Sequence, residues 1–188
     1  MVDIWHCDTA GVYSDVAANN TVGKKFLRSY QTTNTAGQVN FTTIYPGWYS
    51  GRAIHIHVRV RTYNGTTVLG NYVTQLFFDD TITDTVFQSA PYNTRNTRDP
   101  RNAADMVYTG AQNASRALLT LTKTDTGYAA SINVGVDIAA GTAAVTTTSY
   151  ALPQAVFGGG WYTGIYLANT TTAAASVALN TPNIVSFR

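Results

Sequence analysis

The sequence predicts an all-β protein, built as a β-sandwich of antiparallel and mixed strands. Short runs alternate apolar and polar residues, and a turn signal recurs roughly every ten residues. The composition agrees, because Thr, Asn and Tyr are plentiful and only 12% of the 188 residues are charged. At 45% hydrophobic residues, the chain is long and apolar enough for one full domain with a core. Such low charge is also common in secreted proteins, so we expect an extracellular location.

The expected strands follow one another with turn residues between most of them. The Asn-Gly pair in "YNGT" is the strongest hairpin signal, and "NTAG" and "DTG" indicate two further hairpin turns. One segment, residues 79–108, interrupts the alternation. We expect it to begin with a short helix capped by Asp80 or Thr81 and to continue as a long polar loop. The predicted strands cover residues 2–5, 26–33, 38–46, 54–62, 67–78, 116–124 and 128–136.

The chain divides into three predicted parts. Residues 1–138 form the β-sandwich domain. Residues 139–153 are small, Thr-rich and uncharged and end in proline, which is typical of a linker. Residues 154–188 resume strand-like alternation but are too few for an independent domain, so they are expected to be a fragment of a C-terminal β-module. Because the chain opens directly on a strand, we also expect an N-terminal truncation that removed a signal peptide.

Composition and charge exclude several kinds of partner and site. The formal net charge of +2 is too small to predict nucleic-acid binding. No apolar stretch has the length of a transmembrane helix, so no membrane partner is expected. Cys7 is the only cysteine, which excludes an internal disulfide and a cysteine-rich zinc or iron–sulfur site. We expect Cys7 to be a small buried residue.

The segment "PGWYSGRAIHIHVRVR", residues 46–61, carries two histidines in a strand pattern. Successive strand side chains alternate between faces, so His55 and His57 share one face while the aliphatic residues beside them face the core. Their Cβ atoms are about 6.5–7 Å apart along the strand, which lets two imidazoles meet at one metal ion. A His-x-His pair also occurs by chance, as half-exposed strand histidines, and that alternative stays open from the pair alone.

Two tyrosines offer further ligands. Tyr49 lies six residues before His55, and Tyr13 lies in a glycine-containing loop after the first strand. No Asp or Glu is near the histidine pair in sequence, so an iron(II) site with one carboxylate is poorly supplied, and so is a zinc hydrolase with a general base. Phenolate oxygens together with imidazoles suit a hard, oxidised ion such as Fe(III).

Three segments together resemble the intradiol ring-cleavage dioxygenases of catechol or protocatechuate type, in their secreted branch. They are "VDIWHCDTAGVYS", "FTTIYPGWYSGRAIHIHV" and "TQLFF", in that order, and the resemblance covers residues 2–136. It implies a non-haem Fe(III) enzyme that uses O₂ to open a catechol-type ring between its two hydroxyls and releases a muconate-type diacid. The implied partners are therefore a small aromatic diol and O₂.

The resemblance also implies a role for each matching residue. Tyr13, Tyr49, His55 and His57 are the implied iron ligands. Tyr49 is implied to leave when the substrate chelates the iron, and a dissociating phenolate can also accept a substrate proton.

Three further residues are implied around these ligands. Arg52 is implied to stabilise negative charge on the substrate, which its permanent charge suits. Gln75 is implied to line the same pocket, although a buried amide also serves structure. Trp48 either walls the substrate pocket or packs.

A second function class competes with the enzyme. The chain would then be a non-catalytic secreted β-sandwich module that binds carbohydrate or a surface partner and has kept or lost the metal site. The predicted linker and C-terminal fragment favour this alternative, because such parts are common in modular secreted proteins. The joint presence of Tyr13, Tyr49, His55 and His57 favours the dioxygenase.

Overall fold

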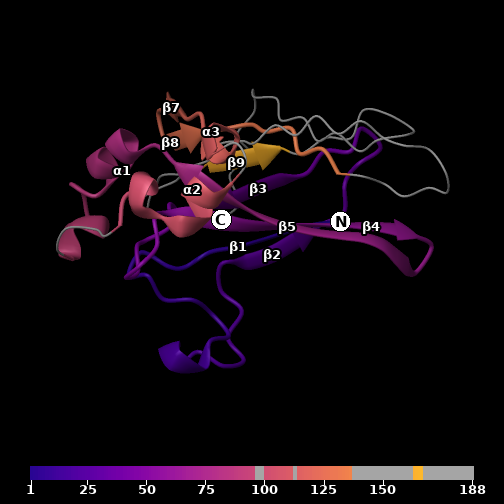
Figure 1. Ribbon diagram of the computed structural model, residues 1–188, viewed down its shortest axis with the longest axis horizontal. Helices are drawn as coiled ribbons and strands as arrows, with labels where there is room; N and C mark the ends of the chain where they lie inside the picture. Colours follow the sequence, from indigo (N-terminus) through magenta and orange to yellow (C-terminus); the bar gives the residue numbers. More distant parts are fainter. Residues whose placement is uncertain (96–99, 112–113, 137–162, 167–188) are drawn as a thin grey trace.

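A five-stranded sheet is the main element of the computed structural model, which describes residues 1–95, 100–111, 114–136 and 163–166 (Figure 1). Its strand order is β2-β1-β4-β5-β6. The first four strands are antiparallel, and β6 joins β5 in parallel. The protein is thus an all-β sandwich, as predicted. The strands are β1 (Val2–Trp5), β2 (Arg28–Gln31), β4 (His55–Asn64), β5 (Thr67–Phe78) and β6 (Leu118–Leu119).

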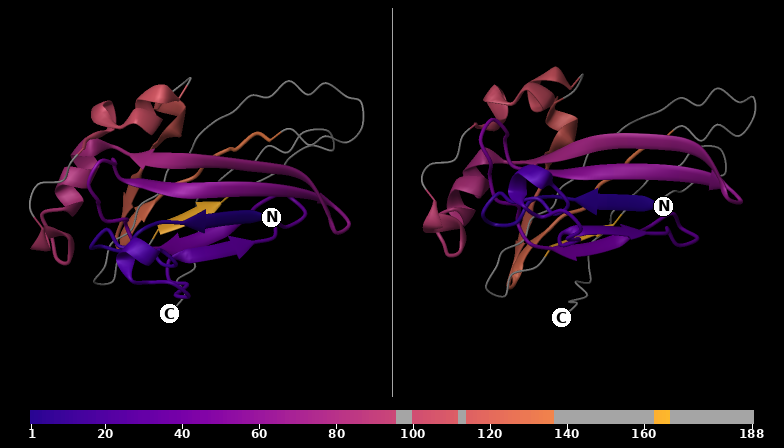
Figure 2. Two further views of the ribbon diagram at one scale, coloured as in Figure 1. Left: turned by 60° about the horizontal axis from the view of Figure 1, so that its bottom comes forward. Right: turned by 90° about the horizontal axis from the view of Figure 1, so that it is seen from below.

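Two shorter strand pairs cover one face of this sheet. β3 (Asn40–Thr43) pairs with β9 (Thr163–Tyr166), and β7 (Thr122–Thr124) pairs with β8 (Gly127–Ala129) (Figure 2). The hydrophobic core lies between the layers. It joins residues of the large sheet, such as Ile56 and Val58, to Phe41 of β3 and Tyr128 of β8.

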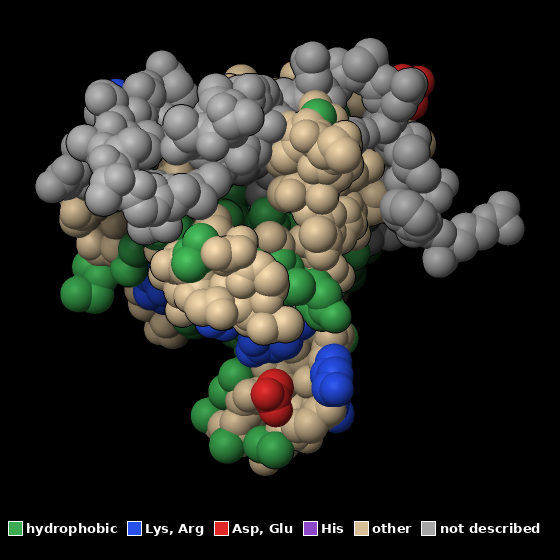
Figure 3. All heavy atoms as spheres, turned by 90° about the vertical axis from the view of Figure 1, so that its right-hand side faces the viewer, with side chains coloured by type: hydrophobic (Ala, Val, Ile, Leu, Met, Phe, Trp, Pro, Cys, Tyr) green, Lys and Arg blue, Asp and Glu red, His purple; other side chains and the backbone are tan. Residues whose placement is uncertain are grey.

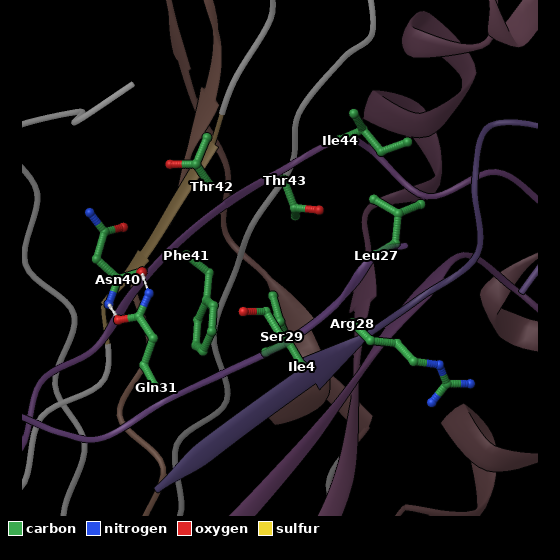
Figure 4. Close-up of a pocket in the computed structure, with 10 residues that line it drawn as sticks. All are labelled: Ile4, Leu27, Arg28, Ser29, Gln31, Asn40, Phe41, Thr42, Thr43 and Ile44. Atoms are coloured by element: carbon green, nitrogen blue, oxygen red, sulfur yellow. Dashed lines mark hydrogen bonds between the residues drawn. The ribbon is translucent and has the colours of Figure 1, made fainter. Parts of the chain in front are cut away.

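The "NTAG" turn forms, but it does not produce a hairpin between its flanking strands. β2 pairs with β1, and β3 pairs with β9, so the chain crosses from one layer to the other at this turn. The Gln31 side chain bridges the layers by donating to Asn40 O and accepting from Asn40 N (Figure 4). A groove of about 550 Å³ remains between β2 and β3. The hairpin prediction was wrong here because packing against the core, not the turn, selects the strand partner.

The β4–β5 hairpin forms around Asn64 and Gly65, as predicted. Gly65 has φ 57°, a left-handed conformation that glycine adopts without strain. The register places His57 opposite Trp5 of β1 on one side and Gln75 of β5 on the other. Directly opposed residues share a face, so these three side chains form one row on the outer side of the sheet.

The segment after β5 holds most of the helical residues. α1 (Asp80–Val86) is capped by Asp79, whose carboxylate accepts from Thr81 N at 2.8 Å and Ile82 N at 3.1 Å. The helix prediction is confirmed, but the predicted caps were wrong by one or two positions, because several adjacent residues can cap and only the backbone path selects one. The other short helices are η1 (Ala17–Asn19), η2 (Tyr92–Thr94), η3 (Asn102–Ala104), α2 (Met106–Gly110) and α3 (Ala114–Ala117).

The C-terminal part of the chain agrees less closely with expectation. The predicted strand 116–124 is divided into the end of α3, β6 and β7. The predicted linker, 139–153, lies outside the described residues, as does most of 154–188 apart from β9. The predicted domain boundaries therefore stay a prediction. Within the part of the chain that the structure describes, no helix has the length and apolarity that crossing a membrane requires.

Candidate metal centre

Tyr13 lies on a loop whose polar side chains hold the backbone in place. The Asp8 carboxylate accepts from Ala10 N and Val12 N, both at 2.9 Å, which closes the turn after β1. Thr21 Oγ1 then donates to Tyr13 O at 2.6 Å. These bonds hold the Tyr13 backbone firmly, so its ring enters the site from a fixed position.

The loop that carries Tyr49 packs backbone to backbone against the Tyr13 loop. Gly47 N donates to Asp8 O at 3.0 Å, and a Cβ at Gly47 would lie 2.4 Å from that same oxygen. Gly11 has φ 81°, and a Cβ there would lie 2.0 Å from Trp48 O. Only glycine permits this close approach, which sets the spacing between the two tyrosines.

Arg95 fastens these loops together from the outside. Its Nη1 donates to Ala10 O at 2.6 Å and also to Trp48 O. Its guanidinium carbon lies 3.9 Å from the centre of the Trp48 ring, a cation–π contact. Arg95 therefore links the two segments that deliver Tyr13 and Tyr49.

Four side-chain atoms converge on one point. Tyr13 Oη, Tyr49 Oη and His57 Nε2 each lie 3.2 Å from His55 Nε2. The atoms come from two loops and one strand. In a tetrahedral shell, ligand atoms separated by this distance correspond to metal–ligand bonds of about 2.0 Å, the length usual for imidazole nitrogen.

The chemistry of these atoms fits a hard metal ion. His55 Nδ1 lies 2.7 Å from Ala53 O, so we assign its proton to Nδ1 and the free lone pair to Nε2. That single lone pair can accept from only one of the two phenols that approach it. Among the described residues, no group of three or more His, Cys, Asp and Glu could hold a metal. The four donor residues can form a metal site only because two of them are tyrosines.

Burial sets the protonation states around this point. Desolvation lowers the pKa of His55 to about 4 and that of His57 to about 3. Both imidazoles are therefore neutral near pH 7 and able to donate electrons to a cation. Desolvation also raises the pKa of Tyr13 and Tyr49, so without a cation both phenols keep their protons. A bound cation would favour the phenolate forms.

The Trp5 ring supports the site from behind. It is parallel to the His57 imidazole, with an interplanar angle of 2° and 4.7 Å between ring centroids. The pairing of β1 with β4 places the two rings in the same row. The stack limits rotation of His57 and directs its Nε2 towards His55.

Arg52 lies beside the four atoms and is held by two partners. Its Nε donates to Asp105 Oδ2 at 2.9 Å, and its Nη2 donates to Gln75 Oε1. Asp105 is fully buried and also accepts from Ala53 N at 2.8 Å. The guanidinium is thus fixed in direction as well as in charge.

Sequence reasoning missed Asp105. It lies 53 residues from Arg52, in the segment expected to be a polar loop, and local sequence marks it only as a helix cap. Its other oxygen accepts from Val107 N at 2.8 Å and Tyr108 N at 3.0 Å. Burial alone would raise the pKa of Asp105, but the bonds from Tyr108 N, Arg52 and Ala53 N outweigh it and lower the pKa. With both oxygens engaged, this carboxylate is no free base for a zinc hydrolase.

Solved structures of known proteins share this fold. The structure of an intradiol ring-cleavage dioxygenase from Tetranychus urticae is 30% identical, with a TM-score of 0.56, over 66% of this chain and 64% of that one. The chain resembles intradiol ring-cleavage dioxygenases. A second structure, of a dioxygenase, is 31% identical with a TM-score of 0.54, over 64% of this chain and 62% of that one. The chain thus spans less than two thirds of either structure. No protein-family model and no curated protein sequence matches it.

The remaining predicted residues lie around the four donor atoms as follows. The Gln75 carbonyl oxygen accepts from Arg52, so this part of the amide orients the guanidinium. Trp48 is half-buried, packs against the core and lies beneath Arg95. Its role in walling a substrate pocket stays a prediction. The third histidine, His6, has a structural role, because its ring nitrogens contact Cys7 O at 2.8 Å and Thr43 Oγ1 at 2.7 Å.

Proposed function

We propose that the protein is a non-haem Fe(III) intradiol dioxygenase. It would cleave a catechol-type ring between the two hydroxyls with O₂ and release a muconate-type diacid. The observation that carries this proposal is the convergence of Tyr13, Tyr49 and His57 at 3.2 Å from His55 Nε2. The two dioxygenase structures of similar fold support the same reaction class. No observation favours the carbohydrate-binding or surface-binding module.

Tyr13, Tyr49, His55 and His57 would hold the iron. When bound, Fe(III) supplies the Lewis-acid and redox centre that a catechol and O₂ require. The protein contributes a preorganised set of donors, since the loops and the strand already place them at ligand spacing. The two neutral imidazoles need lose no proton on binding, whereas each phenol must release one.

Tyr49 is the residue suited to proton transfer. It is less deeply buried than Tyr13 and lies on the same short loop as Arg52. As a phenolate, Tyr49 Oη would accept the proton of an incoming catechol hydroxyl and then turn away, which makes room for the substrate oxygen. Tyr13, with its backbone bound by Thr21 and Asn19, would stay in place.

Arg52 would serve the negative charge that develops on the substrate. Its guanidinium cannot lose its proton at accessible pH, so the site keeps one fixed positive charge. Asp105 and Gln75 hold it against rotation, and a preoriented cation needs no reorganisation during the reaction. Asp105 is a positioning residue, because it contacts Arg52 rather than the donor set.

Visible absorption tests the ligand assignment. Tyrosinate bound to Fe(III) absorbs visible light, so the iron-loaded protein should be red-brown. Tyr49→Phe should shift this absorption and slow substrate deprotonation, whereas Tyr63→Phe, at the exposed end of the β4–β5 hairpin, should leave both unchanged. A colourless protein after iron loading, or an unaltered spectrum in both Tyr49→Phe and Tyr13→Phe, would refute the assignment.

An extracellular location belongs to the same proposal. It is supported by the low content of charged residues and by the resemblance to the secreted branch of the family. Recovery of the native protein from cells rather than from the surrounding medium would count against it.

A further inference from the structure

A second hollow lies behind the metal centre, on the outer face of the large sheet. We call it the basic groove. Its volume is about 490 Å³, within the range of small-molecule sites. Figure 3 shows Lys and Arg side chains gathered where a lobe projects below the main body of the molecule. The residues that define the groove are Trp5, Lys24, Lys25, Arg28, Tyr30 and Arg59.

Strand register places most of these side chains in the groove. Trp5 of β1 lies opposite Arg28 of β2, and Asp3 lies between Tyr30 of β2 and Arg59 of β4. Opposed residues share a face, so they all project from the outer side of the sheet. Lys24 and Lys25 enter from the loop before β2 and close the lower side.

The groove carries a surplus of positive charge. Four cationic side chains line it against two carboxylates, Asp3 and Asp15. Arg61, which is not among the lining residues, already binds Asp3 through two bonds of 2.9 and 2.6 Å. Asp15 accepts from Gly23 N at 3.0 Å.

The cations differ in how firmly they are held. Arg28 is fixed by Ser14, with Nε 2.8 Å from Ser14 Oγ and Nη2 2.8 Å from Ser14 O. Within the described part of the chain, neither Lys24 nor Lys25 forms an ion pair with a carboxylate. The groove thus offers one oriented guanidinium and two ammonium groups that remain available to an anion.

Aromatic surface lies beside this charge. Tyr30 is 62% exposed, so much of its ring is open to a ligand. Trp5 lies between the groove and the proposed metal donors, with one face of its ring stacked on His57. A ligand in the groove is therefore separated from the donor set by the Trp5 ring.

We propose that the basic groove binds a small aromatic carboxylate, at a site separate from the metal centre. The ligand ring packs on Tyr30 and the edge of Trp5, and its carboxylate lies among Arg28, Lys24 and Lys25. One feature supports each half of this assignment: the charge surplus with available lysines for the carboxylate, and the exposed aromatic surface for the ring. This inference does not depend on the proposed reaction.

Calorimetric titration of the protein with benzoate tests the proposal. We expect saturable binding that weakens with added salt. Lys24→Glu and Lys25→Glu should each weaken it about tenfold, because each replaces an attraction by a repulsion of similar size. Lys123→Glu makes the same charge change on β7, away from the groove, and should bind as the unaltered protein does. Unchanged binding in both groove variants, or equal loss in Lys123→Glu, would overturn the proposal.

Two analogues separate the contributions of charge and ring. Benzamide has the ring without the charge, and cyclohexanecarboxylate has the charge without an aromatic face. Both should bind more weakly than benzoate. Benzoate should also shift the backbone amide resonances of Lys25 and Tyr30 but not that of Gly110, which lies in α2. Absence of saturable benzoate binding, or shifts that do not include the groove residues, would refute the site.

Discussion

Replacing Asp105 with Asn would test how Arg52 is held. The Asp105 carboxylate accepts four hydrogen bonds, two from Val107 N and Tyr108 N and two from Arg52 Nε and Ala53 N. An asparagine has one acceptor oxygen. If that oxygen keeps the helix cap, the amide NH₂ faces two other donors, and the Arg52 side loses both of its bonds.

The free-energy cost follows from these bonds. Removing one partner of a buried ion pair costs about 3–5 kcal/mol. Asp105 is fully buried, but the Arg52 side chain is 19% exposed, so water partly compensates the freed guanidinium. We therefore expect Asp105→Asn to lower the free energy of unfolding by about 3 kcal/mol, near the lower limit of that range.

Urea unfolding at pH 7 gives the measurement, and Asp84→Asn gives the control. Asp84 pairs with Arg101 at 2.8 Å, but the two side chains are 42% and 53% exposed. Breaking such an exposed pair should change the unfolding midpoint very little, because water and salt already screen the two charges. Asp105→Asn should also lower kcat/KM for a catechol more than Asp84→Asn does, because Arg52 loses its orientation. Equal unfolding midpoints for the two variants would refute the reasoning.

The pKa of Asp105 also predicts how the stability of the protein changes with pH. Its folded pKa is lowered below the ordinary value of 3.8, so its stabilising contribution is complete above that value and is lost as the pH falls through the folded pKa. Acid unfolding below about pH 4 should therefore be less steep in Asp105→Asn than in the unaltered protein.

Two further predictions concern the packing around the centre. Gly47→Ala should force the two tyrosine loops apart and greatly reduce the visible absorption of the iron-loaded protein. Gly110→Ala, which has open space at its Cβ, should leave the absorption unchanged. Retained absorption in Gly47→Ala would contradict the role assigned to this close approach. Burial lowers the pKa of His6 from 6.5 to about 4, so the unfolded chain takes up this proton first and stability should fall as the pH drops from about 6.5 to about 4. The urea midpoint should fall less between pH 7 and pH 5 in His6→Gln than in the unaltered protein. The fall that remains in the variant comes from His55 and His57, whose pKa values are also lowered. An equal fall in both proteins would contradict this prediction.

Local patterns in the sequence were sufficient for strands β1, β4 and β5 and for part of the site. Alternation places His55 and His57 on one face of β4 whatever the strand packs against, because side chains alternate in any strand. Asn64 and Gly65 likewise specify the β4–β5 hairpin through backbone preferences of two adjacent residues. The loop tyrosines Tyr13 and Tyr49 could be named as partners from the resemblance.

Other features depend on contacts that sequence spacing does not encode. The turn between β2 and β3 was recognisable, yet its strands belong to different sheets, because the core determines which strand each one pairs with. The segment expected to be a polar loop holds Asp105, which caps α2 and is the buried partner of Arg52.

The sequence by itself determined which residues offer donor atoms and which face of β4 two of them occupy. Only the tertiary structure decided that these atoms converge. Tyr13 Oη, Tyr49 Oη and His57 Nε2 each lie 3.2 Å from His55 Nε2. The physical reason is that this convergence depends on two loops packing backbone to backbone at Gly11 and Gly47. Such packing is a property of the folded chain, because it joins segments that are far apart in sequence.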